Sequence, residues 1–326
     1  MFLVTGGVGF IGSNLVAALS DRGAEVAVCD RFGHDERWRN IAKHEIADFV
    51  APDDLLSWLK RAPKIEAVLH LGANSSTVEK DVDHIVEANI RPTLALWQWC
   101  TDTKTPLIYA SSAATYGDGA HGFIDDDSRD FLAKLRPLNA YGWSKLIFDR
   151  RVARIVSQGG ARPPQWVGLK FFNVYGPNEY HKGLMKSVVA QNFTRVRNGE
   201  NLRLFKSERT GFSDGGQKRD FVYVRDCVDA ILWLIDNPRV NGLFNLGTGH
   251  ARSWLDLAHA LFAALGKPPA IEFIPMPPEI GQRYQYFTEA RMTKLREAGY
   301  SKPFTSLEDG VADYVKRFLS HDDPYR

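Results

Sequence analysis

The stretch "VTGGVGFIGS", residues 4–13, places Gly6, Gly9 and Gly12 directly after the first apolar run of the chain. The spacing G-x-x-G-x-x-G lies where a first strand would turn into a first helix. Glycines at such a turn let the backbone bend tightly, let a pyrophosphate reach the helix N-terminus and let the helix pack closely on the strand. The stretch therefore predicts a dinucleotide site in the first strand-to-helix turn.

The second apolar run, "AEVAVCD", ends at Asp30. A carboxylate at the end of the second strand can accept a hydrogen bond from the adenosine ribose, which favours NAD. Arg31 follows at once, and Arg37 and Arg39 lie just beyond, where guanidinium groups could instead bind a 2′-phosphate. The residues alone leave NAD and NADP open.

Further apolar runs alternate with segments of helical period along the first half of the chain. "FLV", "AVLHLG" (67–72) and "PLIYASS" (106–112) have no polar alternation, which is typical of parallel strands covered on both faces. Strands that alternate with helices imply right-handed crossovers. The fold class predicted is α/β, a doubly wound parallel sheet, and "WVGLKFFNVYG" (166–176) is expected to form another buried strand.

After Gly176 the pattern loosens into a loop, a helix near 184–197, a short strand "LRLF" and a glycine-rich polar stretch. Strand and helix patterns return from 219 onward. We expect a dinucleotide-binding domain of residues 1–175 and 217–249. A smaller α/β substrate lobe would comprise 176–216 and 250–326, interleaved with it in sequence.

The composition limits the classes of partner. The chain has 326 residues, 44% of them hydrophobic, and a net charge of +2, so no charge field selects nucleic acid or an anionic membrane. Its three cysteines show no C-x-x-C spacing and are expected as buried thiols. The N-terminus lacks a basic leader, and no apolar run approaches the about 18 residues of a membrane span. These features predict a cytoplasmic protein that binds neither nucleic acid nor membrane.

The stretch "AYGWSK" (140–145) puts Tyr141 and Lys145 one helical turn apart, where an ammonium group could favour ionisation of a phenol. Taken alone, the spacing favours a solvated helix face, so the rest of the chain must support a catalytic role. His70, His84 and His259 lack the spacing of metal ligands, so no metal site is predicted.

Taken in order, the glycine turn, "YASSAATYG" (109–117) and Tyr141-x-x-x-Lys145 resemble the extended short-chain dehydrogenase/reductase family. Four later stretches are most similar to one branch of it, the ADP-glyceromanno-heptose 6-epimerases. These stretches are "FFNVYGPNEYHKG" (171–183), "KRDFVYVRD" (218–226), "LFNLGTG" (243–249) and "RYQYFTEARMTKLREAGYSKPF" (283–304). The resemblance implies a Rossmann domain that holds NADP, with NAD as the alternative.

The resemblance also implies roles for individual residues. Tyr141 would be a catalytic acid/base, Lys145 would bind the nicotinamide ribose and stabilise the tyrosinate, and Ser112 would hydrogen-bond the sugar. Lys182 matches a second base. The implied cofactor contacts are Gly6, Gly9, Phe10, Ile11, Gly12, Asp30, Arg31, Arg37, Leu71, Gly72, Ala73, Asn74, Ser75, Asn89, Tyr141 and Lys145. The implied substrate contacts are Ser112, Asn173, Lys182, Met185, Phe205, Arg219, Arg283 and Tyr284.

The activity that the resemblance implies is interconversion of ADP-D-glycero-D-manno-heptose and ADP-L-glycero-D-manno-heptose. The sugar would be oxidised transiently with tightly held NADP, and hydride would return to the opposite face. A phenol is a weak base at neutral pH, so Lys145 and the cationic nicotinamide are expected to favour the phenolate of Tyr141. The product would feed lipopolysaccharide core biosynthesis, and relatives of this kind form homo-oligomers.

Alternatives remain open at this level. A dehydratase of the family would carry an Asp-Glu pair where this chain has Ala113 and Ala114, which counts against elimination. A UDP-hexose 4-epimerase would use the same oxidation and return. A dinucleotide-binding regulatory module without turnover is the non-enzyme alternative. Lys182 could instead pair with Glu179, and His181 could take its role.

Overall fold

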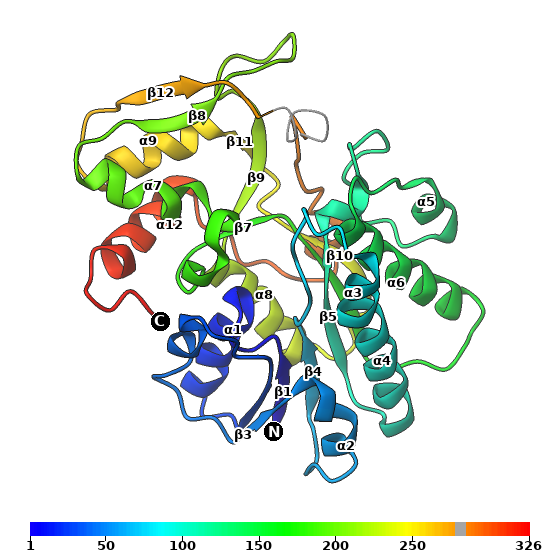
Figure 1. The fold of residues 1–326 in the computed structure, drawn as a ribbon. Coiled ribbons are helices and arrows are strands. Elements are labelled where there is room, and N and C mark those ends of the chain that lie inside the picture. Colours follow the sequence, from blue (N-terminus) through cyan, green and yellow to red (C-terminus); the bar gives the residue numbers. More distant parts are fainter. Residues whose placement is uncertain (278–284) are drawn as a thin grey trace.

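A seven-stranded parallel sheet forms the centre of the computed structural model, which describes residues 1–277 and 285–326 (Figure 1). Its strands occur in the order β10-β6-β5-β4-β1-β2-β3. In chain order they are β1 (Phe2–Thr5), β2 (Val26–Cys29), β3 (Asp48–Val50), β4 (Ala67–His70), β5 (Leu107–Ser112), β6 (Trp166–Phe171) and β10 (Gly242–Leu246). The predicted doubly wound parallel sheet is confirmed.

Strand order reverses between β1 and β4. The chain builds β2 and β3 on one side of β1 and then crosses to β4, which pairs with the other side of β1 from Phe2↔Ala67 to Thr5↔His70. Loops that leave neighbouring strands in opposite directions open a crevice at the carboxyl ends of the strands. The glycine turn after β1 and the segment after β4 both lie at this point.

Helices cover both faces of the sheet, with α1 and α8 on one side of β1, β4 and β5 and with α3, α4 and α6 on the other (Figure 1). The main-sheet helices are α1 (Phe10–Asp21), α2 (Leu55–Leu59), α3 (Val82–Ile85), α4 (Arg91–Thr103), α5 (Arg129–Lys134), α6 (Ala140–Ser157) and α8 (Val224–Asp236). Short 3-10 or π-helical turns among them are η1 (Glu36–Asn40), η2 (Pro52–Asp54), η3 (Val86–Ile90) and η4 (Ala113–Tyr116).

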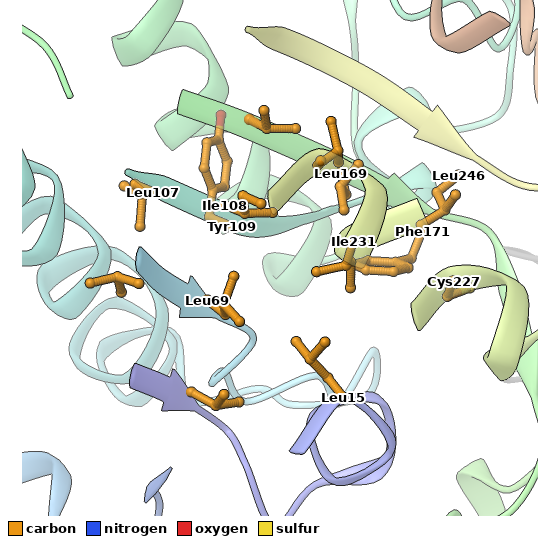
Figure 2. Packing of buried hydrophobic residues seen from close by; sticks show 14 of the residues in the cluster. Leu15, Leu69, Leu107, Ile108, Tyr109, Leu169, Phe171, Cys227, Ile231 and Leu246 are labelled. Atoms are coloured by element: carbon orange, nitrogen blue, oxygen red, sulfur yellow. The ribbon is translucent and has the colours of Figure 1, made fainter. Parts of the chain in front are cut away.

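The main core lies between α1, α8 and the strands. Figure 2 shows Leu15 of α1 and Ile231 of α8 among Leu69, Leu169 and Leu246 of the sheet. All five side chains are buried. Because each such side chain contributes about 1.5–3 kcal/mol on burial, this continuous apolar layer fixes the position of α1 on the strands.

The second part of the fold contains two small sheets. Strand β9 (Lys218–Tyr223) pairs in parallel with β7 (Asn173–Tyr175) and antiparallel with β11 (Ala251–Ser253), and β12 (Ile271–Ile274) pairs with β8 (Leu202–Phe205). The remaining helices are η5 (Tyr180–Met185), α7 (Val188–Arg197), α9 (Trp254–Ala264), α11 (Thr293–Glu297), α12 (Leu307–Tyr314) and η6 (Val315–Leu319). A separate apolar cluster packs much of this part together.

The prediction of one strand over 166–176 is wrong. The chain leaves the main sheet after Phe171, and β7 then pairs with β9 in a different sheet. Apolar residues run through both strands, so the sequence pattern gives no sign of the change. The predicted strand "LRLF" is confirmed as β8, and the division into two interleaved lobes stays a prediction.

Other expectations about the chain concern its thiols and helices. Cys29, Cys100 and Cys227 are buried free thiols, as predicted, and burial raises the pKa of Cys29 to about 12. None of the helices in the described ranges combines the length and the apolar character needed to cross a bilayer.

Asp220 of β9 ties the small sheet to the end of the main sheet. Its fully buried carboxylate accepts hydrogen bonds from the Thr248 backbone (2.7 Å) and hydroxyl (2.8 Å), and from the backbones of Gly249 (2.9 Å) and Ala290 (3.0 Å). The glycine-rich turn after β10 is thus folded around one carboxylate, which holds the two parts of the fold in register.

We predict that Asp220→Ala lowers the free energy of unfolding by about 3 kcal/mol or more, because several buried donors lose their acceptor. Urea denaturation measures the change. Asp236→Ala is the matched control, since its ion pair with Arg22 (3.1 Å) is exposed and should contribute no more than about 1 kcal/mol. Equal losses in the two variants would contradict this role for Asp220.

Candidate active site

Glycines at the end of β1 bring two backbones into contact. Gly6 has a φ of +70°, and a Cβ there would lie 2.6 Å from the backbone nitrogen of Gly72. A Cβ on Gly12 would lie 2.0 Å from the carbonyl oxygen of Gly6. Helix α1 begins after Gly9 with no side-chain cap, so its first N–H groups can bind an anion. The shape and the donors fit the pyrophosphate of a dinucleotide.

Asp30 follows β2 and supports the same turn. Its carboxylate accepts hydrogen bonds from the backbones of Val8 (3.0 Å) and Arg31 (2.8 Å). Burial raises the pKa of Asp30, and these two hydrogen bonds oppose the shift. A carboxylate fixed in this way can still accept a ribose hydroxyl, as the sequence predicts.

The neighbouring arginines have carboxylate partners of their own. Arg31 pairs with Asp53 at 2.7 Å, and Arg37 pairs with Asp35 at 2.9 Å. The Asp35 carboxylate also caps η1, and hydrogen bonding to it raises the pKa of Arg37. Both pairs are partly open to solvent, so a phosphate could replace either aspartate at small cost.

The segment after β4, residues 71–75, is fastened by Asn89. The Asn89 side chain accepts a hydrogen bond from the Asn74 backbone (2.7 Å) and donates to the Asn74 carbonyl (2.9 Å). It also donates to the Ser144 hydroxyl (3.0 Å), which in turn donates to the carbonyl of Tyr141 (2.7 Å). Asn89 therefore links the predicted cofactor segment to the helix that carries the predicted acid/base.

Sequence reasoning missed Ser144. The signal available was its place inside the "AYGWSK" stretch, one helical turn after Tyr141 and on the buried side of α6. Leu71, Gly72, Ala73 and Ser75 lie in the segment that Asn89 fastens, and their contacts with a cofactor stay a prediction.

The predicted Ser-Tyr-Lys set is assembled where η4 meets α6. Ser112 ends β5, and its hydroxyl accepts a hydrogen bond from Ala114 (3.1 Å). A Cβ on Gly142 would lie 2.6 Å from the Ala114 carbonyl oxygen, so glycine allows α6 to approach η4 closely. As a result the Ser112 hydroxyl can hydrogen-bond with the Tyr141 side chain.

Burial sets the charge of these groups. It raises the pKa of Tyr141, while hydrogen bonding with Ser112 opposes the shift. It lowers the pKa of Lys145 to about 8, with the charge of Asp149 opposing. The Lys145 Nζ lies 5.9 Å from the centroid of the Tyr141 ring. The expectation that Lys145 and the cationic nicotinamide together favour the phenolate stays a prediction.

Lys182 lies beside the start of α1. Its Nζ is 5.3 Å from the centroid of the Phe10 ring, and burial lowers its pKa, with the charge of Glu179 opposing. Glu179 itself accepts hydrogen bonds from the Ser187 hydroxyl (2.6 Å) and the Gly176 backbone (3.3 Å). The carboxylate is thus occupied by other donors, and Lys182 is left facing an aromatic ring of the glycine turn.

His181 is a weaker candidate. Burial lowers its pKa to about 4, and its Nδ1 lies 3.3 Å from the side-chain nitrogen of Asn40. A neutral, hydrogen-bonded imidazole cannot supply a proton at neutral pH.

The predicted substrate contacts lie on the small sheets and η5. Asn173 of β7 pairs with Phe221 of β9. Arg219 lies two residues before Phe221 in β9, and its guanidinium is 5.8 Å from the centroid of the Trp254 ring. Met185 is exposed at the end of η5, and Phe205 is half-buried at the end of β8. Arg283 and Tyr284 lie outside the described residues.

Two residues that the sequence did not single out complete the surroundings. Lys170 of β6 and Asp149 of α6 form a fully buried ion pair at 2.6 Å. A signal existed, since Lys170 is the one charged residue in the buried strand "WVGLKF". No cluster of three or more metal-ligating side chains occurs in the residues that the structure describes.

The chain is similar to known proteins over its whole length. A model described as the NAD dependent epimerase/dehydratase family matches residues 2–247. An ADP-L-glycero-D-manno-heptose-6-epimerase of Nitratidesulfovibrio vulgaris is 46% identical over 329 residues, covering 100% of both chains. The crystal structure of the Helicobacter pylori ADP-L-glycero-D-manno-heptose-6-epimerase is similar with a TM-score of 0.79, 26% identity and coverage of 98% and 96%. The crystal structure of Thermus thermophilus UDP-glucose 4-epimerase in complex with NAD is similar with a TM-score of 0.75 and 28% identity. The match covers 98% of this chain and 99% of that one.

We predict that Gly6→Ala lowers dinucleotide affinity at least roughly tenfold, because a Cβ would push the turn away from Gly72. Isothermal titration calorimetry measures the affinity. Gly23→Ala is the matched control: its φ is +73°, yet a Cβ there would have no neighbour within 4 Å. It should lower stability by about 1 kcal/mol and leave affinity unchanged. Unchanged affinity in Gly6→Ala would contradict the assigned cradle.

Proposed function

We propose that this chain, which belongs to the NAD dependent epimerase/dehydratase family, interconverts ADP-D-glycero-D-manno-heptose and ADP-L-glycero-D-manno-heptose. The observation that carries the proposal is the placing of Ser112, Tyr141 and Lys145 on elements tied by hydrogen bonds to the dinucleotide cradle. The full-length similarity to proteins of that name supports the choice of substrate.

The chemistry follows from the carbon that must be inverted. It carries a hydroxyl group and a hydrogen that is not acidic, so it is inverted through a ketone: hydride leaves the carbon, the hydroxyl loses a proton, and both return with hydride on the other face. A bound nicotinamide dinucleotide supplies the reversible acceptance of that hydride. The protein must orient the sugar and move the proton.

Tyr141 is the group that takes the hydroxyl proton in this proposal. Its phenol is neutral in the chain alone, so it becomes a base only where positive charge compensates the phenolate. Lys145 supplies such charge while it is an ammonium ion. The Ser112 hydroxyl can donate a hydrogen bond either to the Tyr141 oxygen or to the reacting oxygen of the sugar. The pair therefore works best below the Lys145 pKa of about 8.

Lys182 is proposed as the second acid/base. A ketone that offers both faces to one hydride donor must turn, and its oxygen then points to a different place in each orientation. A second proton donor is needed there, and partial burial lowers the pKa of Lys182 from its ordinary value, which makes the ammonium group a better donor. His181 is neutral and bonded elsewhere, which favours Lys182.

NADP is the proposed dinucleotide. Asp30 can accept from a ribose hydroxyl, but Arg31 and Arg37 follow it closely and pair with partly exposed carboxylates that a 2′-phosphate can replace. The charge of Arg37 also acts on Asp30, so the two lie at the same end of the cradle.

A consequence for the cell follows from this substrate. We place the reaction in the cytoplasm, where nucleotide sugars are made, and its product would feed the assembly of the lipopolysaccharide inner core. The expectation of a homo-oligomer stays a prediction.

We predict that Arg37→Ala weakens NADP binding by roughly ten- to a hundredfold, the value of one charge-assisted hydrogen bond, and leaves NAD binding unchanged. Fluorescence titration of the two dinucleotides measures both affinities. An equal loss for NAD and NADP would mean that Arg37 supports the fold of η1 and does not recognise the 2′-phosphate.

We predict that Tyr141→Phe and Lys182→Met each slow interconversion of the two ADP-heptoses by roughly 10²–10⁴-fold, because each removes one proton-transferring group. Proton NMR of the substrate, without added coenzyme, follows the appearance of the second diastereomer. Dinucleotide content of the purified variants should match that of the wild type.

Lys316→Met, a loss of charge at an exposed position, is the control and should keep full activity. Near-full activity in Lys182→Met would refute the second acid/base. Turnover of UDP-glucose with no turnover of ADP-heptose by the unaltered protein would instead identify a hexose 4-epimerase, the activity named for the similar Thermus thermophilus enzyme.

A further inference from the structure

A buried ion pair lies behind the proposed active site. The Lys170 Nζ contacts the Asp149 carboxylate at 2.6 Å, and both side chains are fully buried. Asp149 also accepts hydrogen bonds from the hydroxyls of Ser111 (2.7 Å) and Tyr109 (3.3 Å). Lys170 donates a second hydrogen bond to the Thr115 hydroxyl (2.8 Å). The pair thus joins α6, β5, β6 and η4.

These contacts reach both sides of the site. Ser111 directly precedes Ser112, and the Thr115 hydroxyl donates to the Ser112 carbonyl (2.8 Å). Asp149 lies one helical turn after Lys145 on α6, on the same face. A single carboxylate therefore connects the strand end that presents Ser112 with the helix that presents Lys145.

Stability alone is a weak reason for such a pair. Two charges removed from water lose much of their hydration, and apolar residues of similar size often give equal or better stability. The surrounding layer is otherwise apolar and aromatic, as with Tyr116, whose ring lies 5.1 Å from the Lys170 Nζ. An effect of the Asp149 carboxylate on Lys145 can explain why the pair is present.

We propose that Asp149, held by Lys170, is a positioning residue that keeps Lys145 an ammonium ion and fixes it relative to Ser112. The benefit of this arrangement for catalysis rests on the proposed function, whereas the titration that tests it needs no substrate. The charge of Asp149 raises the pKa of Lys145 against the effect of burial.

The other groups that face Lys145 in the described chain do not replace Asp149. Tyr141 on α6 is neutral, because burial raises its pKa. His70 on β4 is also neutral, because burial and the charge of Lys145 lower its pKa to about 3. Its ring nitrogens lie 2.6 Å and 2.8 Å from the hydroxyls of Thr5 and Thr93. Lys170 on β6 is a cation and cannot stabilise a second one.

The test is the titration of Lys145 by NMR in the full chain labelled with ¹⁵N at lysine Nζ, with its signal assigned from Lys145→Arg. The midpoint should be near pH 8 in the wild type. In Asp149→Asn it should fall by roughly one pH unit, a tenfold loss of proton affinity, because the attracting charge is gone. In Lys170→Met it should not fall, because a neighbouring cation is removed while the Asp149 carboxylate stays.

Tyr109→Phe is the matched control. It removes a hydrogen bond of 3.3 Å from the same carboxylate but keeps the ion pair, so the midpoint should stay where it is in the wild type. If Asp149→Asn does not fold, the double variant Asp149→Asn/Lys170→Met removes both charges together. Its midpoint should still fall, but by less, because a neighbouring cation is lost as well.

An unchanged midpoint in Asp149→Asn or in the double variant would overturn the inference and leave the pair as a scaffold. Equal shifts in Tyr109→Phe and Asp149→Asn would overturn it as well, because packing would then explain both. Failure of the unaltered protein to turn over ADP-heptose would refute the proposed function alone, since the titration needs no substrate.

Discussion

The contact between the turn after β1 and the loop after β4 is the constraint on which the rest of the site depends. Gly6 has a left-handed backbone conformation, and a Cβ on it would collide with the backbone of Gly72, so no side chain is accepted at position 6. This contact lies at the point where strand order reverses, beside the N-terminus of α1. Asn89 connects this loop to α6, because its side chain accepts a hydrogen bond from Asn74 and donates one to Ser144, which donates to the Tyr141 carbonyl.

Burial, opposed at specific points by charge, governs the chemistry of the site. Desolvation keeps Tyr141, His70 and His181 neutral and lowers the pKa of Lys145 and Lys182. Asp149 and Glu179 act in the opposite sense on the two lysines. Each lysine thus has one carboxylate that tunes it, and neither carboxylate is open to solvent. Shifted pKa values of this kind, set by burial and one charged neighbour, are typical of functional sites.

Much of the fold was predictable from local pattern. The glycine spacing and the unbroken apolar runs indicate a parallel sheet, since the first requires a strand-to-helix turn and the second requires burial on both faces. The change of sheet after Phe171 was not predictable, because residues 166–171 and 173–175 are similar in composition. Which sheet a strand joins depends on distant partners such as Phe221.

The site was predictable only as far as motifs reach. Tyr141, Lys145 and Ser112 are found by spacing and resemblance, whereas Ser144, Asp149 and Lys170 act through contacts between distant elements. The upward shift of the Tyr141 pKa also escapes the sequence, because the spacing of residues does not show how deeply the phenol is buried.

The central claim is that the hydrogen on the inverted carbon leaves as hydride and returns without entering solvent. Interconversion of the ADP-heptoses in D₂O, followed by NMR and mass spectrometry of the product, tests it directly. The account predicts that the inverted carbon keeps protium through many turnovers, because only the hydroxyl proton passes through Tyr141 and Lys182. Deuterium on that carbon would contradict the account, since it would mean that the carbon loses a proton and not a hydride.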